Sequence, residues 1–564
     1  MGVGMDRKYK NKKGGFFYFD GPWDVIKQGT AKEYSEAFDQ HIKGNRKLSS
    51  LAGGSSNRFL PEFKDVSPSH TSQRELFRNK VNYVCHLNDF EIESVAEAMV
   101  GLRARGSDHL QPAGYTYFAQ LLTHDIVSST SLLRTRNASS ALNLDSIYFD
   151  YDQVLGWEAV DALGRFVICG DGADFYRTKW GAEELRKEKY DIPPSRTEPY
   201  YFAVIPDHRN DDNVILSQLH VLLLKLHNQV VELLVGEVIK RKGDREKVSG
   251  REYYEHARDL VVLIFQQVTV SDLLNRTLDQ DTFDYYFSQY GPSLFPDLES
   301  GGIIPKEFTH AVSRYAHSMI RSHYFFNEHN QYQISTAKLF KKNTPLKSDK
   351  ENLIIYDWRS FFSMPWQSYD GVKNRANKIE LSAASLPVST GSQQTQSIPA
   401  KNLATFDITA SSQLVTYSNV LQSEAIQNFL ENVKGIEPDS YFKKIDYSDI
   451  NDALSRLNAD ISLDNSNAPF LVSMYLESSA MPQKHNHDRL GVIGSIVYAE
   501  TIRMSIVQAE VNYMQNEIDL RRSLMWTYPV YQSILNSLDS ITMIGLSNFI
   551  TSTKRGHYDS TGIY

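Results

Sequence analysis

The feature that most constrains the fold is the apolar segment at residues 214–240. Its apolar residues cover most of the surface that a helix would present, instead of forming one stripe. Such a helix is stable only when other elements cover it, so the segment predicts a buried central helix. A chain of 564 residues, 41% hydrophobic and 23% charged, has the composition of a globular protein that can supply the surrounding core.

Helical patterns recur along the rest of the chain. Residues 1–60 are rich in Lys, Gly and Ser and are expected to form a flexible arm, followed by one large domain over residues 61–564. Residues 382–413 are rich in Ser, Thr and Gln and predict a long loop. The expected fold is therefore mostly α with little β structure, with further helices at 112–130, 252–275, 305–324 (opened by Pro305), 449–460 and 491–523.

Composition argues against several classes of protein. The two cysteines, Cys85 and Cys169, allow at most one disulfide and no zinc or iron–sulfur cluster. A net charge of −8 argues against a general nucleic-acid binder. The basic N-terminus lacks the apolar core of a signal peptide, and apolar runs such as residues 260–265 are too short to span a bilayer. We expect a cytoplasmic protein without a membrane span, and its oligomeric state is left open.

The segment 112–130 holds the most informative polar pair. If it is helical, Gln120 and His124 lie four residues apart on one face. A histidine and an amide that point together into a cavity can move a proton and orient a small polar ligand. Ordinary hydrogen bonds within a core explain the same spacing, and on spacing alone that interpretation is the more common one.

Two further candidates stand in separate segments. Arg209 lies in a cluster of charges just before the central helix, where it is either a loop cation or a charge stabiliser at a reaction site. His317 lies among apolar residues, where it is either a core histidine or an axial ligand of a metal cofactor. No spacing rule connects these residues with His124, so the residues alone leave both alternatives open.

Four segments, in this order, carry a resemblance to a known family: PAGYTYFAQLLTHDI at 112–126, ALNLDSIY at 141–148, DHRNDDNVILSQLHVLLLKLHN at 207–228 and EFTHAVSRYAHSMIR at 307–321. They resemble the distal helix, the calcium loop, the distal-arginine segment and the proximal helix of the peroxidase–cyclooxygenase superfamily. This superfamily contains the animal haem peroxidases and their bacterial relatives. The resemblance implies a divergent member with a large, single-domain helical peroxidase fold.

The resemblance also implies roles for individual residues. His124 matches the distal histidine, which takes a proton from hydrogen peroxide and delivers it to the departing oxygen. Gln120 matches the distal glutamine that lines the ligand pocket, and Arg209 the arginine that stabilises developing negative charge. His317 matches the ligand of the haem iron. The implied activity is a peroxidase that uses hydrogen peroxide to oxidise an unidentified donor.

A calcium site beside the distal histidine is implied as well. Its ligands would be Asp125 on the distal helix and Ser139, Asn143 and Asp145 in the following loop. Asn143 replaces an aspartate of the family pattern, so one ligand charge is lost. Phe149 replaces the usual glycine at the end of the loop.

Other departures concern the haem. Thr123 stands where the family has an acid that can form an ester with the haem. Asp212 stands at the second such position and has a shorter side chain than the family's acid. Asn213 replaces a methionine that can form a covalent bond to the haem. The resemblance therefore implies a non-covalent haem b. The segment that orients the proximal histidine departs from the family pattern, and Gln413 is the candidate partner for His317.

Two alternatives are kept beside the peroxidase. The dioxygenases of the superfamily, which act on fatty acids, carry a tyrosine three residues before the proximal histidine, and this chain has Arg314 there. A catalytically impaired haem-binding protein of the same fold is favoured by the altered calcium and proximal segments. The presence of all three distal residues, His124, Gln120 and Arg209, argues for an active enzyme.

Overall fold

The computed structural model describes about two thirds of the chain. The described residues are 76–77, 85–102, 111–127, 140–156, 158–180, 200–211, 213–242, 248–296, 304–326, 334–339, 346, 353–363, 372–379, 381, 400–480 and 489–553. The expected arm at 1–60 lies outside these residues.

Helices dominate the described residues. The α-helices are α3 (Asp89–Gly101), α4 (Gly114–Ile126), α5 (Tyr151–Gly156), α7 (Val214–Lys242), α8 (Gly250–Val268), α9 (Asn275–Thr277), α10 (Gln280–Phe283), α12 (Lys306–His310), α13 (Thr336–Leu339), α14 (Ala400–Ser411), α15 (Tyr417–Leu421), α16 (Glu424–Phe429), α17 (Pro438–Phe442), α18 (Ser448–Arg456), α19 (Phe470–Ala480), α21 (Val492–Val507), α22 (Glu517–Leu524), α23 (Tyr528–Ser537) and α24 (Met543–Thr553). Short 3₁₀ helices are η4 (His208–Asp211), η8 (Val312–His317), η9 (Trp358–Ser360) and η12 (Met525–Thr527), and π-helical turns are η6 (Thr269–Leu274), η7 (Asp284–Ser288) and η11 (Leu430–Lys434).

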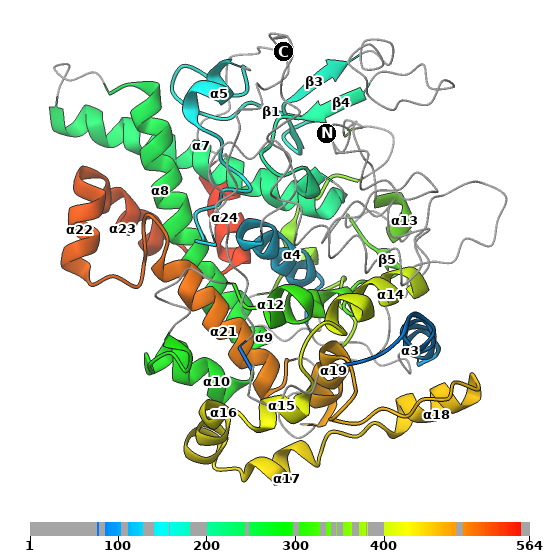
Figure 1. Ribbon diagram of the computed structural model, residues 1–564. Helices are drawn as coiled ribbons and strands as arrows, with labels where there is room; N and C mark the ends of the chain where they lie inside the picture. The colour runs from blue at the N-terminus through cyan, green and yellow to red at the C-terminus, as the bar shows by residue number, and fades with distance from the viewer. Residues whose placement is uncertain are drawn as a thin grey trace, which may run out of the picture.

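Within the described ranges, the strands form three separate antiparallel pairs. These are β1 (Ile168–Cys169) with β2 (Asp174–Phe175), β3 (Arg177–Trp180) with β4 (Tyr200–Ala203), and β5 (His323–Tyr324) with β6 (Ile334–Ser335). Figure 1 shows β3 and β4 at the upper edge of the molecule, away from the central helices. The prediction of a mostly helical fold with little β structure is confirmed.

Helix α7 is the buried central helix that the sequence predicts. Ile215, Leu219, Leu226, Val230 and Leu234 have no exposed surface. Helices α4, α8, α23 and α24 pack against α7, and Figure 1 shows α4 and α24 in the middle of the molecule. No helix among the described residues is both long and apolar enough to cross a membrane.

The predicted helix at 305–324 is interrupted. Helix α12 ends at His310, and the backbone of Ala311 (φ −137°, ψ −65°) leaves the helical region before the 3₁₀ helix η8 begins. The predicted helix at 491–523 is likewise two helices, α21 and α22. Residues 252–275 are helical as predicted, but the last turn before Asn275 is the π-helical turn η6.

The predicted loop at 382–413 is wrong over its last third. Residues 400–411 form helix α14, which packs against α3, α12 and α19. Leu403, Phe406 and Ile408 are buried, so the segment does carry an apolar face. The prediction relied on the Ser and Thr content of the segment and so missed this apolar face. Packing against α3 outweighs the modest helix propensity of these Thr and Ser residues.

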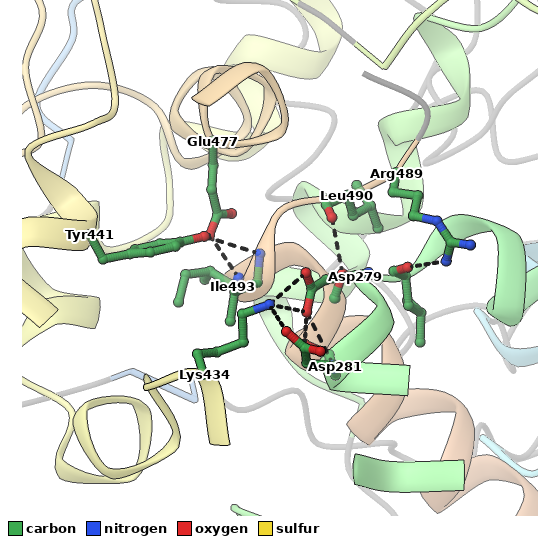
Figure 2. A network of polar contacts seen from close by, with 12 residues as sticks. Asp279, Asp281, Lys434, Tyr441, Glu477, Arg489, Leu490 and Ile493 are labelled. Atoms are coloured by element: carbon green, nitrogen blue, oxygen red, sulfur yellow. Dashed lines mark hydrogen bonds and ion pairs between the residues drawn. The ribbon is translucent and has the colours of Figure 1, made fainter. Parts of the chain in front are cut away.

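Buried carboxylates anchor the helices of the C-terminal half. Glu477 on α19 accepts hydrogen bonds from the hydroxyl of Tyr441 (2.7 Å) and from the amide of Ile493 (2.9 Å) in the first turn of α21 (Figure 2). It also accepts from the hydroxyl of Tyr417 at 2.9 Å. A carboxylate suits a helix N-terminus, where amide groups lack intrahelical partners. Burial raises the pKa of Glu477 to about 6. Because α19 and α21 both pack against η8, this anchor also supports the segment that carries His317.

A buried ion pair lies beside this anchor. Lys434 of η11 is bonded to Asp279 at 2.9 Å and to Asp281, and Arg489 donates to the carbonyl oxygen of Leu278 at 2.6 Å (Figure 2). These contacts fix η11 and the start of α21 to the turn before α10.

Candidate functional site

Helix α4 carries His124 and is fixed at its start by distant segments. A Cβ atom at Gly114 would lie 2.5 Å from the carbonyl oxygen of Phe361, so only glycine allows this close approach. The hydroxyl of the next residue, Tyr115, donates to Asp272 at 2.8 Å, and burial raises the pKa of that carboxyl group. The start of α4 is therefore held by two other segments of the fold.

His124 is fully buried and takes part in a chain of hydrogen bonds. Its Nδ1 lies 2.8 Å from Oδ1 of Asn210 in η4. The Nδ2 atom of Asn210 lies 3.3 Å from the carbonyl oxygen of Ser146 and 3.3 Å from Nδ1 of His220 on α7. Burial lowers the pKa of His220 to about 3, so this histidine is neutral. The sequence did not single out Asn210, because its contact with His124 exists only in the fold.

Helix α4 confirms the predicted helix over Gly114–Ile126 and places Gln120 one turn before His124, while residues 128–130 lie outside the described residues. Gln120 is half-buried, and Thr123 is buried. The roles that the resemblance gives to Gln120 and Thr123 stay predictions.

Arg209 lies against the end of the helix that carries His124. Its Nη2 atom donates to the carbonyl oxygens of His124 and Val127, each at 2.9 Å, and forms an ion pair with Asp207 at 2.7 Å. A cation is favourable at the C-terminus of a helix, where carbonyl groups lack intrahelical partners. Arg209 thus fixes the end of α4, and its predicted role as a charge stabiliser stays a prediction.

A second buried arginine holds the η4 segment in place. Arg177 on β3 pairs with Asp174 at 2.7 Å and with Asp211 at 2.6 Å. Burial raises the pKa of Asp211, while the nearby Arg177 opposes that shift. The triad joins the strand pairs to the segment that carries Arg209 and Asn210. The partner of Asp211 could not be identified from sequence spacing, because Arg177 lies 34 residues earlier in the chain.

The proximal candidates converge on one carboxylate. Asp407 of α14 has its Oδ2 atom 2.8 Å from Nδ1 of His317 and its Oδ1 atom 2.8 Å from Nη1 of Arg314. A 3₁₀ helix has three residues per turn, so Arg314 and His317 share a face of η8. The His317 side chain is 21% exposed, whereas that of Arg314 is fully buried and lies over the ring of Phe406.

Gln413 is therefore not the partner of His317. Asp407 holds that position, six residues earlier in the chain, and the backbone amide of Gln413 instead donates to the carbonyl oxygen of Ala410. The prediction was wrong because it assumed a loop over this segment. Gln413 lies beyond the end of α14, whereas Asp407 lies within the helix.

The loop after α4 is tied to Asp125 by direct hydrogen bonds. The two carboxylate oxygens of Asp125 accept from the amides of Leu144 (2.9 Å) and Ser146 (2.8 Å). Oδ1 of Asn143 accepts from the amide of Glu510 at 2.9 Å. In the described part of the chain no three His, Cys, Asp or Glu side chains gather as they would around a metal ion. The implied calcium site stays a prediction, because its ligand Ser139 lies outside the described residues.

Two candidates cannot be placed. Ser139, an implied calcium ligand, and Asp212, an implied neighbour of the haem, lie outside the described residues. Asn213 is described, and its Oδ1 accepts from the amide of Ile215 at 2.8 Å, so it caps the start of α7.

Comparisons with known proteins agree with this arrangement. Residues 176–375 match the family model for animal haem peroxidase. A stretch of 131 residues is 27% identical to the peroxidasin homolog pxn-2 of Caenorhabditis elegans, and it covers 23% of this chain but only 9% of that protein.

Solved structures with a similar fold include fatty acid alpha-dioxygenases. The one from Arabidopsis thaliana has a TM-score of 0.50 and 12% identity, over 81% of this chain and 77% of that chain. The one from Oryza sativa has a TM-score of 0.50 and 12% identity, over 95% and 91% of the two chains. At this level of identity the likeness establishes the fold and not the activity. Residues 176–375 therefore resemble the animal haem peroxidase family, and the fold of the chain resembles that of the fatty acid alpha-dioxygenases.

Proposed function

We propose that the protein is a haem-dependent peroxidase that uses hydrogen peroxide to oxidise a small donor. The observation that carries the proposal is the pair formed by His317 and Asp407. A carboxylate that accepts the Nδ1 proton leaves the lone pair of the imidazole on Nε2, the atom through which a histidine binds a metal. The partial exposure of the His317 side chain is consistent with an approach by a cofactor from that side.

A haem b held by His317 would supply the redox chemistry, and the chain supplies the binding and proton transfer. The departures at Thr123 and Asn213 support a non-covalent haem. Calcium is not part of this proposal, because the oxygens of Asp125 already accept two backbone amides.

On the distal side, His124 is the proposed acid–base group. A neutral imidazole accepts a proton from one oxygen of hydrogen peroxide and returns it to the departing oxygen as the O–O bond breaks. Arg209 contributes positive charge near this histidine and fixes the end of its helix. Gln120, one turn away, is proposed to orient the peroxide.

The fatty-acid dioxygenase is the less favoured alternative. Arg314 occupies the position where the dioxygenases carry their radical-forming tyrosine, and a guanidinium group cannot form such a radical. Tyr315 is buried, with its hydroxyl 3.4 Å from that of Thr277. On a 3₁₀ helix it points about 120° away from the face shared by Arg314 and His317.

The test begins with absorption spectra of the haem-supplied protein before and after peroxide. We expect a Soret band that His317→Ala removes or shifts, and that His323→Ala, at an exposed position on β5, leaves unchanged. His124→Ala should retain the band but react with peroxide roughly 10²-fold more slowly. A wild-type spectrum in His317→Ala would disprove the assignment of the iron ligand. Oxygen uptake with linoleate, with hydroperoxide formed, would favour the dioxygenase instead.

A further inference from the structure

The orientation of the Asn210 amide can be assigned from its neighbours. The carbonyl oxygen of Ser146 only accepts hydrogen bonds, so the Asn210 atom that lies 3.3 Å from it must be the NH₂ group. The same group lies 3.3 Å from Nδ1 of His220, which can accept when the proton of this neutral imidazole is on Nε2. The contact with Ser146 therefore places the amide oxygen of Asn210 toward His124, and His220 is compatible with this orientation.

The orientation of Asn210 determines which nitrogen of His124 carries a proton. An amide oxygen cannot donate, so Nδ1 of His124, at 2.8 Å, must be the donor. In a neutral imidazole with Nδ1–H, the other nitrogen, Nε2, holds the lone pair. We infer that Asn210 is a positioning residue that holds His124 in the tautomer whose Nε2 accepts a proton. The assignment of the tautomer does not depend on the proposed function, whereas its effect on the rate of reaction with peroxide rests on that function.

The surroundings of the pair keep Asn210 in place. Ser146, whose carbonyl oxygen accepts from Asn210, donates its own amide to Asp125, the neighbour of His124 on α4. Arg209, the neighbour of Asn210, donates to the carbonyl oxygen of His124. The loop at 144–146, η4 and α4 are thus joined at three adjacent points. The other tautomer of His124 would require the Asn210 amide to flip, which would break its hydrogen bond to the carbonyl oxygen of Ser146.

The charged groups around the pair come from three segments. Asp125 lies on α4 itself, and the Arg209–Asp207 pair lies at η4. His220 on α7 contributes no charge, because burial keeps it neutral. Substitution of Asn210 by aspartate would therefore place a new carboxylate directly against Nδ1 of His124.

Two variants test whether Asn210 acts through the tautomer of His124 or only through the stability of the fold. Asn210→Leu removes the acceptor, and we expect the rate of reaction with peroxide to fall by about tenfold or more at every pH. Asn210→Asp keeps an acceptor for Nδ1–H but stabilises the protonated imidazole. Its rate should fall at neutral pH and recover at alkaline pH, so the acid limb of the pH–rate profile moves upward. Asn228→Leu, which removes a part-buried amide bonded to Phe166, is the matched control and should leave the profile unchanged.

A spectroscopic measurement tests the tautomer without any turnover. The protein is labelled with ¹⁵N-histidine, and the signals of His124 are assigned as those that disappear in His124→Ala. Their ¹⁵N chemical shifts should show a proton on Nδ1 in the wild type. The shifts should change in Asn210→Leu. Nε2–H in the wild type, or a wild-type pH profile in Asn210→Leu, would overturn the inference. If the protein does not react with peroxide at all, the proposed function fails, while the ¹⁵N shifts still decide the tautomer.

Discussion

At the scale of residues, the proximal side is organised around a buried charge pair. Arg314 has no exposed surface, and Asp407 is both its ion-pair partner and the acceptor for His317. Removing one partner of such a pair leaves an uncompensated charge in the core, which costs far more than the pair contributes. The sequence indicated Arg314 and His317 but not Asp407, because a contact across 90 residues leaves no local pattern.

We therefore expect Asp407→Leu to lower the free energy of unfolding by about 3–5 kcal/mol, measured by urea denaturation without haem. The double variant Arg314→Met/Asp407→Leu should recover much of that loss, since it removes both charges. The control is Glu517→Ala, which breaks an exposed pair with Arg521 and should cost about 1 kcal/mol or less. Equal effects of Asp407→Leu and Glu517→Ala would contradict the buried-pair interpretation.

At the scale of elements, the junction between α19 and α21 responds to pH through Glu477. Burial raises its pKa from 4.5 to about 6, so the protonated form is favoured in the folded state. The resulting stabilisation is complete below about pH 4.5 and is lost as the pH rises through 6. The shift corresponds to about 2 kcal/mol between these limits.

The measurement is the free energy of unfolding from pH 4.5 to 7 in the wild type and in Glu477→Gln. The variant cannot titrate, so the difference between the two proteins should shrink as the pH rises through this window. Glu477→Gln should also be the less stable protein, because its amide NH₂ would face a donor among Tyr417, Tyr441 and Ile493. A difference that is independent of pH would show that Glu477 does not titrate in this range.

A second element-scale prediction concerns the loop after α4. Because both oxygens of Asp125 accept backbone amides, we expect the carboxylate itself to hold the loop without a metal ion. Asp125→Asn turns one acceptor into a donor that faces an amide, so we expect a loss of about 1–3 kcal/mol. A chelator should leave the melting temperature of the wild type unchanged. A fall in that temperature, restored by added calcium, would reinstate the calcium site.

The elements also show where sequence reasoning succeeds and fails. The helix at 214–240 was predictable because its apolar residues are continuous, and α4 because its segment resembles the distal helix of the superfamily. The break at Ala311 and the helix at 400–411 were not, because both depend on packing against distant elements. The same limit applies to Asn210, whose contacts with His124 and His220 come from three segments of the fold.

At the scale of the whole molecule, the two sides of the site share one core. A single cluster of buried apolar residues extends from Phe77 to Ile550 and includes residues of α4, η8, α7 and α14. Helix α4 packs directly against both η8 and α7. A ligand that binds His317 should therefore stabilise the described fold as a unit and not only the proximal segment.

This gives a prediction for the whole chain. A ligand that binds only the folded state stabilises it by mass action, by about 2.7 kcal/mol at a free concentration of 100 times Kd. Haem should raise the free energy of unfolding by this order in the wild type, measured by urea denaturation at increasing haem concentration. His317→Ala should lose most of the increase, whereas His256→Ala, whose ring packs on Trp526 away from the site, should keep it. An equal increase in both variants would mean that haem binds elsewhere, because His317 is the proposed iron ligand and His256 is not.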